Sequence, residues 1–460
     1  MYKILVFLIG IAFCGCSFRG EIPVADMDFN TTGQSFSIKK DWWKNFDDEN
    51  LNFLVEKALQ NNSDLKLALN NLEKVETIYD LSLREFLPNI GFSGEATRTR
   101  SSGETFSSKE NMKFDNFSLT SVLSWELDLW GRVRNSALAS KANFKASVYD
   151  YENSKISIVA AVVKSYFNFI ALKNKVEIYE ETLKNYENMG EYITKQYKAG
   201  VKSEIEFHQS MAQISTAKAG LFAIEDALNK SKTALLILVG SKTDDVLNGD
   251  FKFTSYFAKS LEVPSGIPSE ILIMRPDVSS AYQKLVATNA FVGVARANYF
   301  PKISLSGAFG FASEELKNLF EQNAQVFSYG GNLAMALPLL DFGKTALNVD
   351  LAKIDQKSAL INYEKILRNA LGETKNALVS KEFAVKNLEA LSKLKDSAYK
   401  IYTLAQARYK SGYSEYLELL ESQRTYLNSQ ISYIDAKLNE LNSCVEIYRN
   451  FGGGFKLKNK

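Results

Sequence analysis

Few of the side chains that usually carry out protein chemistry occur in this 460-residue chain. His208 is the single histidine, so the sequence offers no histidine-based catalytic triad and no histidine-rich metal site. No glycine-rich phosphate loop is present, and we interpret the glycines at 452–454 as a flexible exit from a helix. We interpret His208 as a surface or packing residue. The sequence therefore predicts a protein that is not an enzyme, with no catalytic residues, no metal site and no bound organic cofactor.

The cysteines suggest a lipid anchor. Cys14 and Cys16 end an opening with a positive residue, Lys3, and an apolar stretch at 4–13, which is the layout of a secretory signal. The run Phe13-Cys14-Gly15-Cys16 is similar to a bacterial lipobox, in which a cysteine after a small residue is acylated; Cys16 fits it and Cys14 does not. We expect Cys16 to carry a covalent lipid such as palmitate, and Ser17 is compatible with export to the outer membrane. The alternative is an ordinary cleaved signal with incidental cysteines, and with Cys444 near the other terminus no disulfide framework is expected.

Two acids share one helix face. Glu418 and Glu421 are three residues apart just after "YKSG", so in a helix they lie on the same side. On the residues alone, such a pair is typical of a solvated helix face. Over the whole chain, 55 Lys and Arg are interspersed with 53 Asp and Glu for a net charge of +2, which is not the clustered positive charge of a nucleic-acid-binding protein.

The elements that position these residues occur twice. "FLPNIGFSG" at 86–94 returns as "YFPKISLSG" at 299–307, a shift of 213 residues. "YKAG" at 197–200 returns as "YKSG" at 409–412, and Gly240 as Gly452, both at a shift of 212. A shift held through so many landmarks indicates a duplicated unit.

Each repeat contains a helical hairpin. Intervals 89–263 and 339–460 have no proline, and apolar residues recur there at spacings of three and four, which is typical of a coiled-coil seam. We expect the chain to turn near Gly200 and Gly412. The first arm, at about 132–197, would be roughly 100 Å long at 1.5 Å per residue.

Each repeat also contains two amphipathic strands. Ile90, Phe92 and Gly94 alternate with Ser93 and Glu95, which is strand periodicity, and three further segments alternate likewise. The strands are about ten residues long, as a tilted transmembrane strand requires. Four strands alone leave open edges in a bilayer, so we expect a barrel shared between chains; the alternative is a soluble sheet with one wet face.

These signals give the following boundaries. We predict a lipoprotein signal peptide at 1–15, a lipid-anchored N-terminal segment at 16–50, a first repeat at 51–262, a second repeat at 263–452, and a tail at 453–460. Strands are predicted at about 89–99, 117–128, 302–312 and 328–339, and helical hairpins at about 132–240 and 344–451.

Four segments together carry a family resemblance. "DWWKNFDDENLNFLVEKALQNNSDL", "SEILIMRPDV", "LLDFGK" and "NFGGGF" resemble stretches of the TolC family of outer-membrane efflux ducts, and particularly its OprM-like lipoprotein branch. The resemblance implies a mainly α fold with a small β part, in which four strands per chain make a trimeric 12-stranded β-barrel joined to an α-helical barrel.

The resemblance also implies a function. A homotrimer in the outer membrane, lipid-anchored and with a long periplasmic extension, would passively conduct drugs and other small molecules. It would receive them from an RND-type inner-membrane pump through a periplasmic adaptor protein. The alternatives are an adaptor-type coiled-coil lipoprotein and an exit duct for secreted polypeptides.

Residue roles follow from the same resemblance. Glu418 and Glu421 match acids at the pore constriction, and the turns at Gly200 and Gly412 match the tips where an adaptor docks. Glu206 matches an acid that binds a tyrosine and an arginine of the second hairpin. Tyr409 supplies the tyrosine, but Ser414 replaces the arginine, and Lys410 is the expected substitute.

Overall fold

The computed structural model describes residues 20, 22, 40–100, 113–242, 245, 257, 275–334 and 341–452, with only the backbone described at 331–334. It contains two compact units. The strand unit comprises residues 71–148 and 280–364 as far as they are described, and the hairpin unit comprises the described residues of 40–70, 149–279 and 365–452. The boundaries between the units fall within or at helices α3, α4, α8 and α9, whose bounds follow. The predicted signal peptide, Cys16 and the tail lie outside the described residues.

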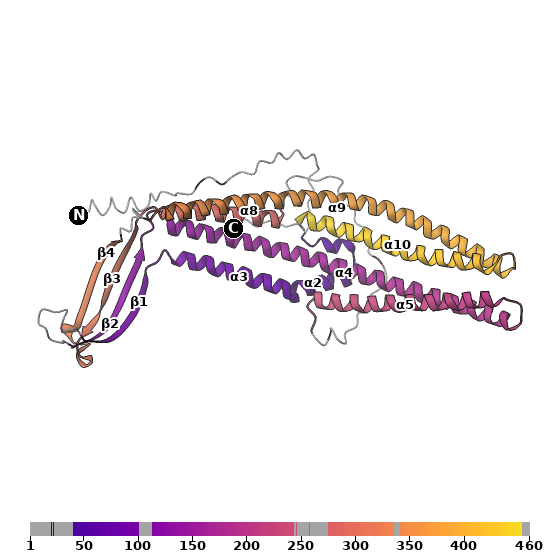
Figure 1. Ribbon diagram of the computed structural model, residues 1–460, viewed down its shortest axis with the longest axis horizontal. Coiled ribbons are helices and arrows are strands. Elements are labelled where there is room, and N and C mark those ends of the chain that lie inside the picture. Colours follow the sequence, from indigo (N-terminus) through magenta and orange to yellow (C-terminus); the bar gives the residue numbers. More distant parts are fainter. Residues whose placement is uncertain are drawn as a thin grey trace. The chain divides into compact units, whose positions relative to one another are not determined.

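The duplication is visible element by element (Figure 1). The main elements of the two repeats match in kind and length: α3 (Ser63–Arg84) with α8 (Pro276–Ala297), β1 (Asn89–Arg100) with β3 (Lys302–Ser313), α4 (Arg132–Lys198) with α9 (Lys344–Lys410), and α5 (Glu204–Leu238) with α10 (Tyr416–Asn450). The long helices have 67 residues each and the returning helices 35 each. The predicted mainly α fold with a duplicated unit and four strands is confirmed.

The four strands form one antiparallel sheet in the order β1-β2-β3-β4. β2 spans Lys113–Glu126 and β4 spans Gln325–Ala334. β2 thus begins before the predicted residue 117, because its ladder with β1 continues to the facing pair Arg100 and Lys113. Within this extension the side chains of Arg98 and Asp115 form two 2.6 Å hydrogen bonds. Residues 335–339 of the last predicted strand lie outside the described residues.

The register makes the sheet amphipathic. Ile90 faces Leu123, Leu119 faces Phe311, and Phe309 faces Phe327, all on one side. The other side carries mainly small or polar residues, among them Ser93 and Thr120, which face each other. Phe92 and Tyr329 on the apolar side are each 83% exposed. Within the described part of the chain β1 and β4 are edge strands, so two edges remain open.

Polar contacts fix the junction of strands and helices in the strand unit. The Trp130 indole donates to the carbonyl oxygen of Pro301 at 2.8 Å and stacks on Phe300. Arg132 donates twice to the Glu126 carboxylate, at 2.7 and 2.9 Å. The Asp128 carboxylate accepts from two backbone N–H groups at the start of α4, which satisfies donors that a helix start leaves free.

The core of the hairpin unit is built on the N-terminal segment. η1 (Trp42–Phe46) and α2 (Glu49–Asn61) pack against α4 and α10, with Trp42 stacked on Tyr448 and Phe46 against Phe167. Asp48 caps α2 and accepts a 2.7 Å hydrogen bond from the Tyr166 hydroxyl. The aromatic residues of "DWWKNF" are therefore part of the buried core of this unit and join the N-terminal segment to α4 and α10.

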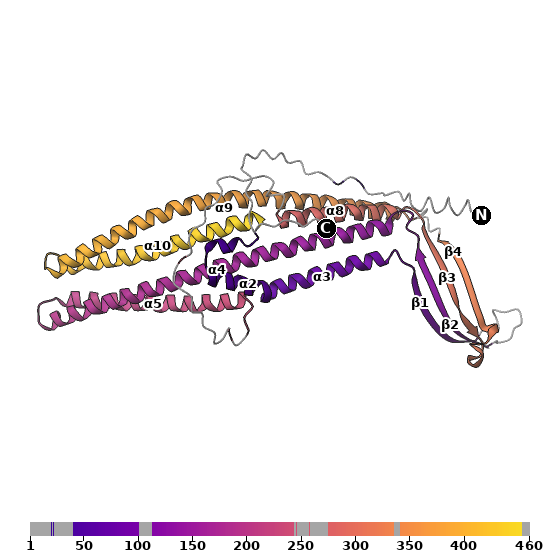
Figure 2. The same ribbon diagram turned by 180° about the vertical axis from the view of Figure 1, so that it is seen from behind.

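The helices of each hairpin lie side by side, as both views show (Figure 2). The turns use the same backbone geometry: Gly200 and Gly412 have φ of 75° and 77°, a region in which glycine avoids strain. The next N–H in each turn bonds back across the helix end, from Val201 to Gln196 and from Tyr413 to Arg408, at 2.9 Å. This is a Schellman ending.

Among the described residues, α4 has an 18-residue window long and apolar enough to cross a membrane by composition. Of that window 56% is buried inside the protein. Val162, Val163 and Ile170 of α4 belong to the core of the hairpin unit, so packing accounts for much of its apolar character.

Candidate functional site

The turn ends of the two hairpins meet in an apolar cluster within the hairpin unit. Its buried members come from α4, α9 and α10: Met189, Ile193, Ala405, Tyr409, Tyr416, Leu419 and Leu420. Phe207 of α5 packs against them. The cluster therefore joins both hairpins near their turns and positions the polar residues around it.

Lys202 connects the two hairpins at this cluster. Its ammonium nitrogen lies 3.1 Å from the Glu206 carboxylate and 4.6 Å from the centre of the Tyr409 ring. Glu206 is held by a capping box at the start of α5, accepting from the backbone N–H of Ser203 while Ser203 accepts from its own. The structure thus brings together two of the predicted residues, Glu206 and Tyr409, through a lysine from the first hairpin.

The electrostatics favour this contact at neutral pH. Burial alone would lower the pKa of Lys202, but its interactions with Glu206 and Tyr409 outweigh this and raise it. Burial raises the pKa of the Tyr409 hydroxyl. An ammonium therefore faces a neutral aromatic ring, the arrangement that a cation–π interaction requires.

Sequence reasoning missed Lys202 and named Lys410, which the structure places on the exposed surface of α9. A signal for Lys202 was present in the repeat. Ser414, which stands where the resemblance expects an arginine, is 212 residues beyond Lys202, so the two positions are equivalent. The cation is found on the same position of the other hairpin.

Glu418 and Glu421 lie on the first turns of α10 with exposed carboxylates. Glu418 is 3.7 Å from Arg408 and Glu421 is 3.1 Å from Arg424. Exposed pairs of this kind contribute about 0–1 kcal/mol, so both carboxylates keep access to water and to dissolved cations.

Apolar residues are exposed at both turns. Val201 and Ile205 lie beside Gly200, and the equivalent positions beside Gly412 are Tyr413 and Leu417. All four are more than half exposed, which is unusual for residues of this kind so close together.

His208 is exposed, 3.7 Å from Glu204, as the surface interpretation predicts. Among the described residues, no group of three or more His, Cys, Asp or Glu side chains is arranged to hold a metal ion.

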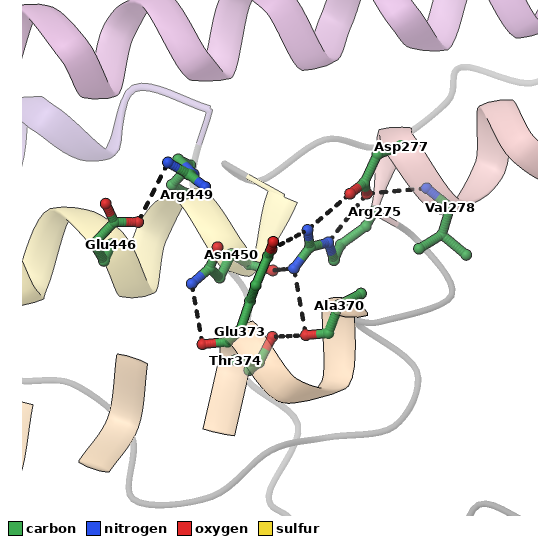
Figure 3. A network of polar contacts seen from close by, with 9 residues as sticks. All are labelled: Arg275, Asp277, Val278, Ala370, Glu373, Thr374, Glu446, Arg449 and Asn450. Carbon is green, nitrogen blue, oxygen red and sulfur yellow. Dashed lines mark hydrogen bonds and ion pairs between the residues drawn. The ribbon is translucent and has the colours of Figure 1, made fainter. Parts of the chain in front are cut away.

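A second polar network links the start of the second repeat to its end (Figure 3). The buried Arg275 guanidinium donates to Asp277 and Glu373 at 2.8–3.1 Å, and to the carbonyl oxygen of Asn450 at 3.3 Å. It therefore ties the start of α8 to α9 and to the end of α10. "MRPD" lies in one of the four segments that resemble the family, and the partners of its arginine come from residues about 100 and 175 positions away.

These features define a class: a duplicated chain with two long helical hairpins and an amphipathic sheet whose strands have the length and alternation of outer-membrane barrel strands. The sequence profile of the outer membrane efflux protein family matches residues 54–241 and 267–453, so the chain belongs to that family. This confirms the predicted function, an outer-membrane channel for efflux, and the predicted location in the outer membrane.

Individual relatives agree. The toluene efflux pump outer membrane protein TtgI of Pseudomonas putida is 30% identical over 414 residues, covering 90% of this chain and 87% of that protein. The cation efflux system protein CusC of Escherichia coli K12 is 27% identical over 470 residues, covering 98% and 99%.

Solved structures are similar over nearly the whole chain. The Campylobacter jejuni CmeC outer membrane channel superposes with a TM-score of 0.93 at 30% identity, covering 97% of this chain and 96% of that one. The open state of the Neisseria gonorrhoeae MtrE channel superposes with a TM-score of 0.81 at 27% identity, covering 95% and 98%.

Proposed function

We propose that three copies of this chain form one passive efflux duct. The observation that carries this proposal is the open amphipathic sheet: unpaired backbone groups at the edges of β1 and β4 are costly in a bilayer, and neighbouring copies would pair them. Three copies of four strands give 12, within the range of known barrels. The duct would have no enzymatic activity of its own and no cofactor.

Its cargo would be small molecules. The relatives are named for solvents, toluene and cations, so no single chemistry is common to them. Drugs and small organic molecules would enter from an RND-type inner-membrane pump through a periplasmic adaptor, since a wide duct takes its selectivity from the pump.

Accumulation of a fluorescent dye and of antimicrobials tests this function. Cells lacking the gene should accumulate more of at least one compound, and restoring the intact gene should reverse the effect. On unheated gels the protein should run as a compact trimer band that heating converts to a monomer. A monomer band before heating would contradict the shared barrel.

We assign the exposed apolar residues of the two turns to adaptor docking, with the turns set by Gly200 and Gly412. A partner that covers Val201, Ile205, Tyr413 and Leu417 would remove this apolar surface from water. Charged substitution of Ile205 or Leu417 should reduce cross-linking to the adaptor and efflux together. His208→Gln, at a polar exposed site in the second turn of α5, is the control.

We assign the pore constriction to Glu418 and Glu421, where three symmetry copies would form rings of carboxylates. Single-channel conductance of Glu421→Ala in planar bilayers tests it: cation selectivity should fall. Glu382→Ala removes an equally exposed, lysine-paired acid and should leave selectivity unchanged. Equal selectivity in all three proteins would remove the assignment.

We propose that Glu206, Lys202 and Tyr409 hold the tips closed between transport events, with Lys410 uninvolved. The similarity to a channel solved in its open state supports an opening of these hairpins. Breaking the contact should raise the open probability in bilayers.

Acylation of Cys16 is the remaining proposal, supported by the lipobox-like sequence. Mass spectrometry of the N-terminal peptide should show a lipidated cysteine, and Cys16→Ser should lack it.

A further inference from the structure

A polar hollow lies in the hairpin unit, and its lining residue Gln423 is next to Arg424, the partner of Glu421. Side chains from α4, α9 and α10 line a half-open hollow of about 30 Å³ there, which is room for one small head group. Its lining includes Glu181, Tyr186, Tyr402, Gln423, Tyr426 and Gln430. Neither the efflux function nor the tip contact uses any of these residues.

The charge of the hollow favours a cation. None of the described residues that line it is Lys, Arg or His, and Glu181 is a carboxylate at its exposed rim. The other polar lining groups are hydroxyls and side-chain amides, which can turn an oxygen toward a donor.

A buried acceptor lies in its wall. Gln423 is only 4% exposed, and its carbonyl oxygen has no hydrogen-bond partner among the described residues. A buried acceptor left unsatisfied is destabilising, so a ligand that donates a hydrogen bond here is favoured.

Aromatic rings supply a second attraction. Tyr402 and Tyr426 stack with ring centres 5.6 Å apart and planes 8° from parallel, and Tyr399 leans against Tyr426 at 5.3 Å. Ring faces attract cations through their quadrupole, most strongly where water is excluded.

The titration of these tyrosines agrees with the geometry. Burial raises the pKa of Tyr186 to about 12, and burial raises the pKa of Tyr402, with the nearby Glu181 carboxylate raising it further. The hydroxyls thus stay neutral at physiological pH and retain oxygen lone pairs for a donor.

We propose that this hollow binds a primary ammonium group, such as the head of an alkylamine or one end of a polyamine. The ammonium has three N–H donors, which suit the Gln423 carbonyl, the Glu181 carboxylate and a tyrosine hydroxyl. The space suits the head group, and an attached chain extends outward past the rim. This site is separate from the acids assigned to the constriction.

Titration of the purified full-length protein in detergent tests the proposal, with n-butylammonium and spermidine as probes and tyrosine fluorescence or calorimetry as the readout. Both probes should bind saturably at constant ionic strength. Tetramethylammonium, which has no N–H donor, should bind at least fivefold more weakly.

Single substitutions distinguish a specific binding site from nonspecific electrostatic attraction of the cation. Glu181→Gln should weaken n-butylammonium binding about tenfold, as expected for losing a charge-assisted hydrogen bond, and Gln423→Leu should weaken it severalfold. Glu180→Gln makes the same charge change one residue away, off the lining, and should bind as the parent does. The trimer band on unheated gels verifies folding of each variant.

Two results would overturn the inference: no saturable binding in the parent, or equal weakening by Glu181→Gln and Glu180→Gln. Because binding is measured on purified protein, a failure here leaves the efflux function untouched, and a loss of efflux leaves this result untouched.

Discussion

In each repeat, the residue just before helix α3 or α8 bonds to the end of the last helix, α5 or α10. The positions are equivalent, but the chemistry of the contact differs. In the first, the amide of Asn62 donates to the carbonyl oxygen of Leu238 at 2.7 Å. In the second, the equivalent residue is Arg275, which donates to the equivalent carbonyl of Asn450 and also to two acids. The place of the contact is the same in both repeats, but the donor is a neutral amide in one and a charged guanidinium in the other.

The hairpin turns show the same divergence. The helix after the first turn starts with a capping box at Ser203 and Glu206, whereas the equivalent Glu415 makes no side-chain cap hydrogen bond. Glu418, equivalent to Glu206, lies near Arg408 instead. Backbone geometry is therefore the shared part of the repeats, and side-chain chemistry is where they have specialised.

The largest expected difference concerns the glycines that end α5 and α10. Gly240 and Gly452 both have positive φ, but a Cβ on Gly240 would lie 2.3 Å from the Asn61 carbonyl oxygen, while one on Gly452 would meet Pro276 at 3.5 Å. Gly240→Ala should cost about 3 kcal/mol, adding a steric clash to the left-handed strain, and Gly452→Ala about 1 kcal/mol. Urea unfolding in detergent measures both. Equal losses would mean that the first repeat relaxes as easily as the second.

The closing contacts themselves should differ less. Arg275→Met should cost about 2 kcal/mol, below the value for a fully buried pair because Asp277 and Glu373 are partly exposed to water. Asn62→Leu should cost about 1–2 kcal/mol, since it removes both the bond to Leu238 and the cap on Leu65. The same unfolding assay applies. If both variants keep the parental free energy of unfolding, these contacts form in the folded protein but do not stabilise it.

The two helix starts should differ by a smaller amount. Ser203→Ala should cost about 1 kcal/mol through the lost cap. Glu415→Ala should be close to neutral, because its side chain caps nothing. Hydrogen exchange of the first turns of α5 and α10 reports each start separately, and faster exchange in the Glu415 variant alone would contradict the comparison.

The smallest expected effect on stability is that of Lys202. Lys202→Met should cost about 0.5–1 kcal/mol, and Lys410→Met nothing measurable. The folded pKa of Lys202 is raised, so its contribution is complete below its unfolded pKa of about 10.4 and is lost as pH rises through the folded value. Parent and Lys202→Met should thus differ at pH 8 and converge at higher pH. A gap that persists unchanged above that range would point to packing instead of charge.

Local patterns made much of the fold predictable. The repeat shift, the absence of proline and the spacing of apolar residues indicated two hairpins turning at Gly200 and Gly412, and strict alternation indicated the strands. These signals act between residues close in sequence, so a single chain reveals them.

The polar contacts were less predictable. Lys202 reaches Tyr409 only because four helix ends pack into one cluster, and Arg275 meets Glu373 only because α8 and α9 are adjacent. Spacing within a sequence does not encode such partners. Lys410 was expected to contact the site because it follows Tyr409 in the sequence, whereas Lys202 lies over the Tyr409 ring in space.

The shift of 213 residues between β1 and β3 becomes 212 between α4 and α9. The change falls in the segments that join the paired strands, 101–112 in one repeat and 314–324 in the other, which differ by one residue. Only there has the duplicated frame accommodated a change in length between these elements. Those segments are consequently the places to insert an epitope or a fluorophore, and antibody binding to whole cells would then report which side of the membrane they occupy.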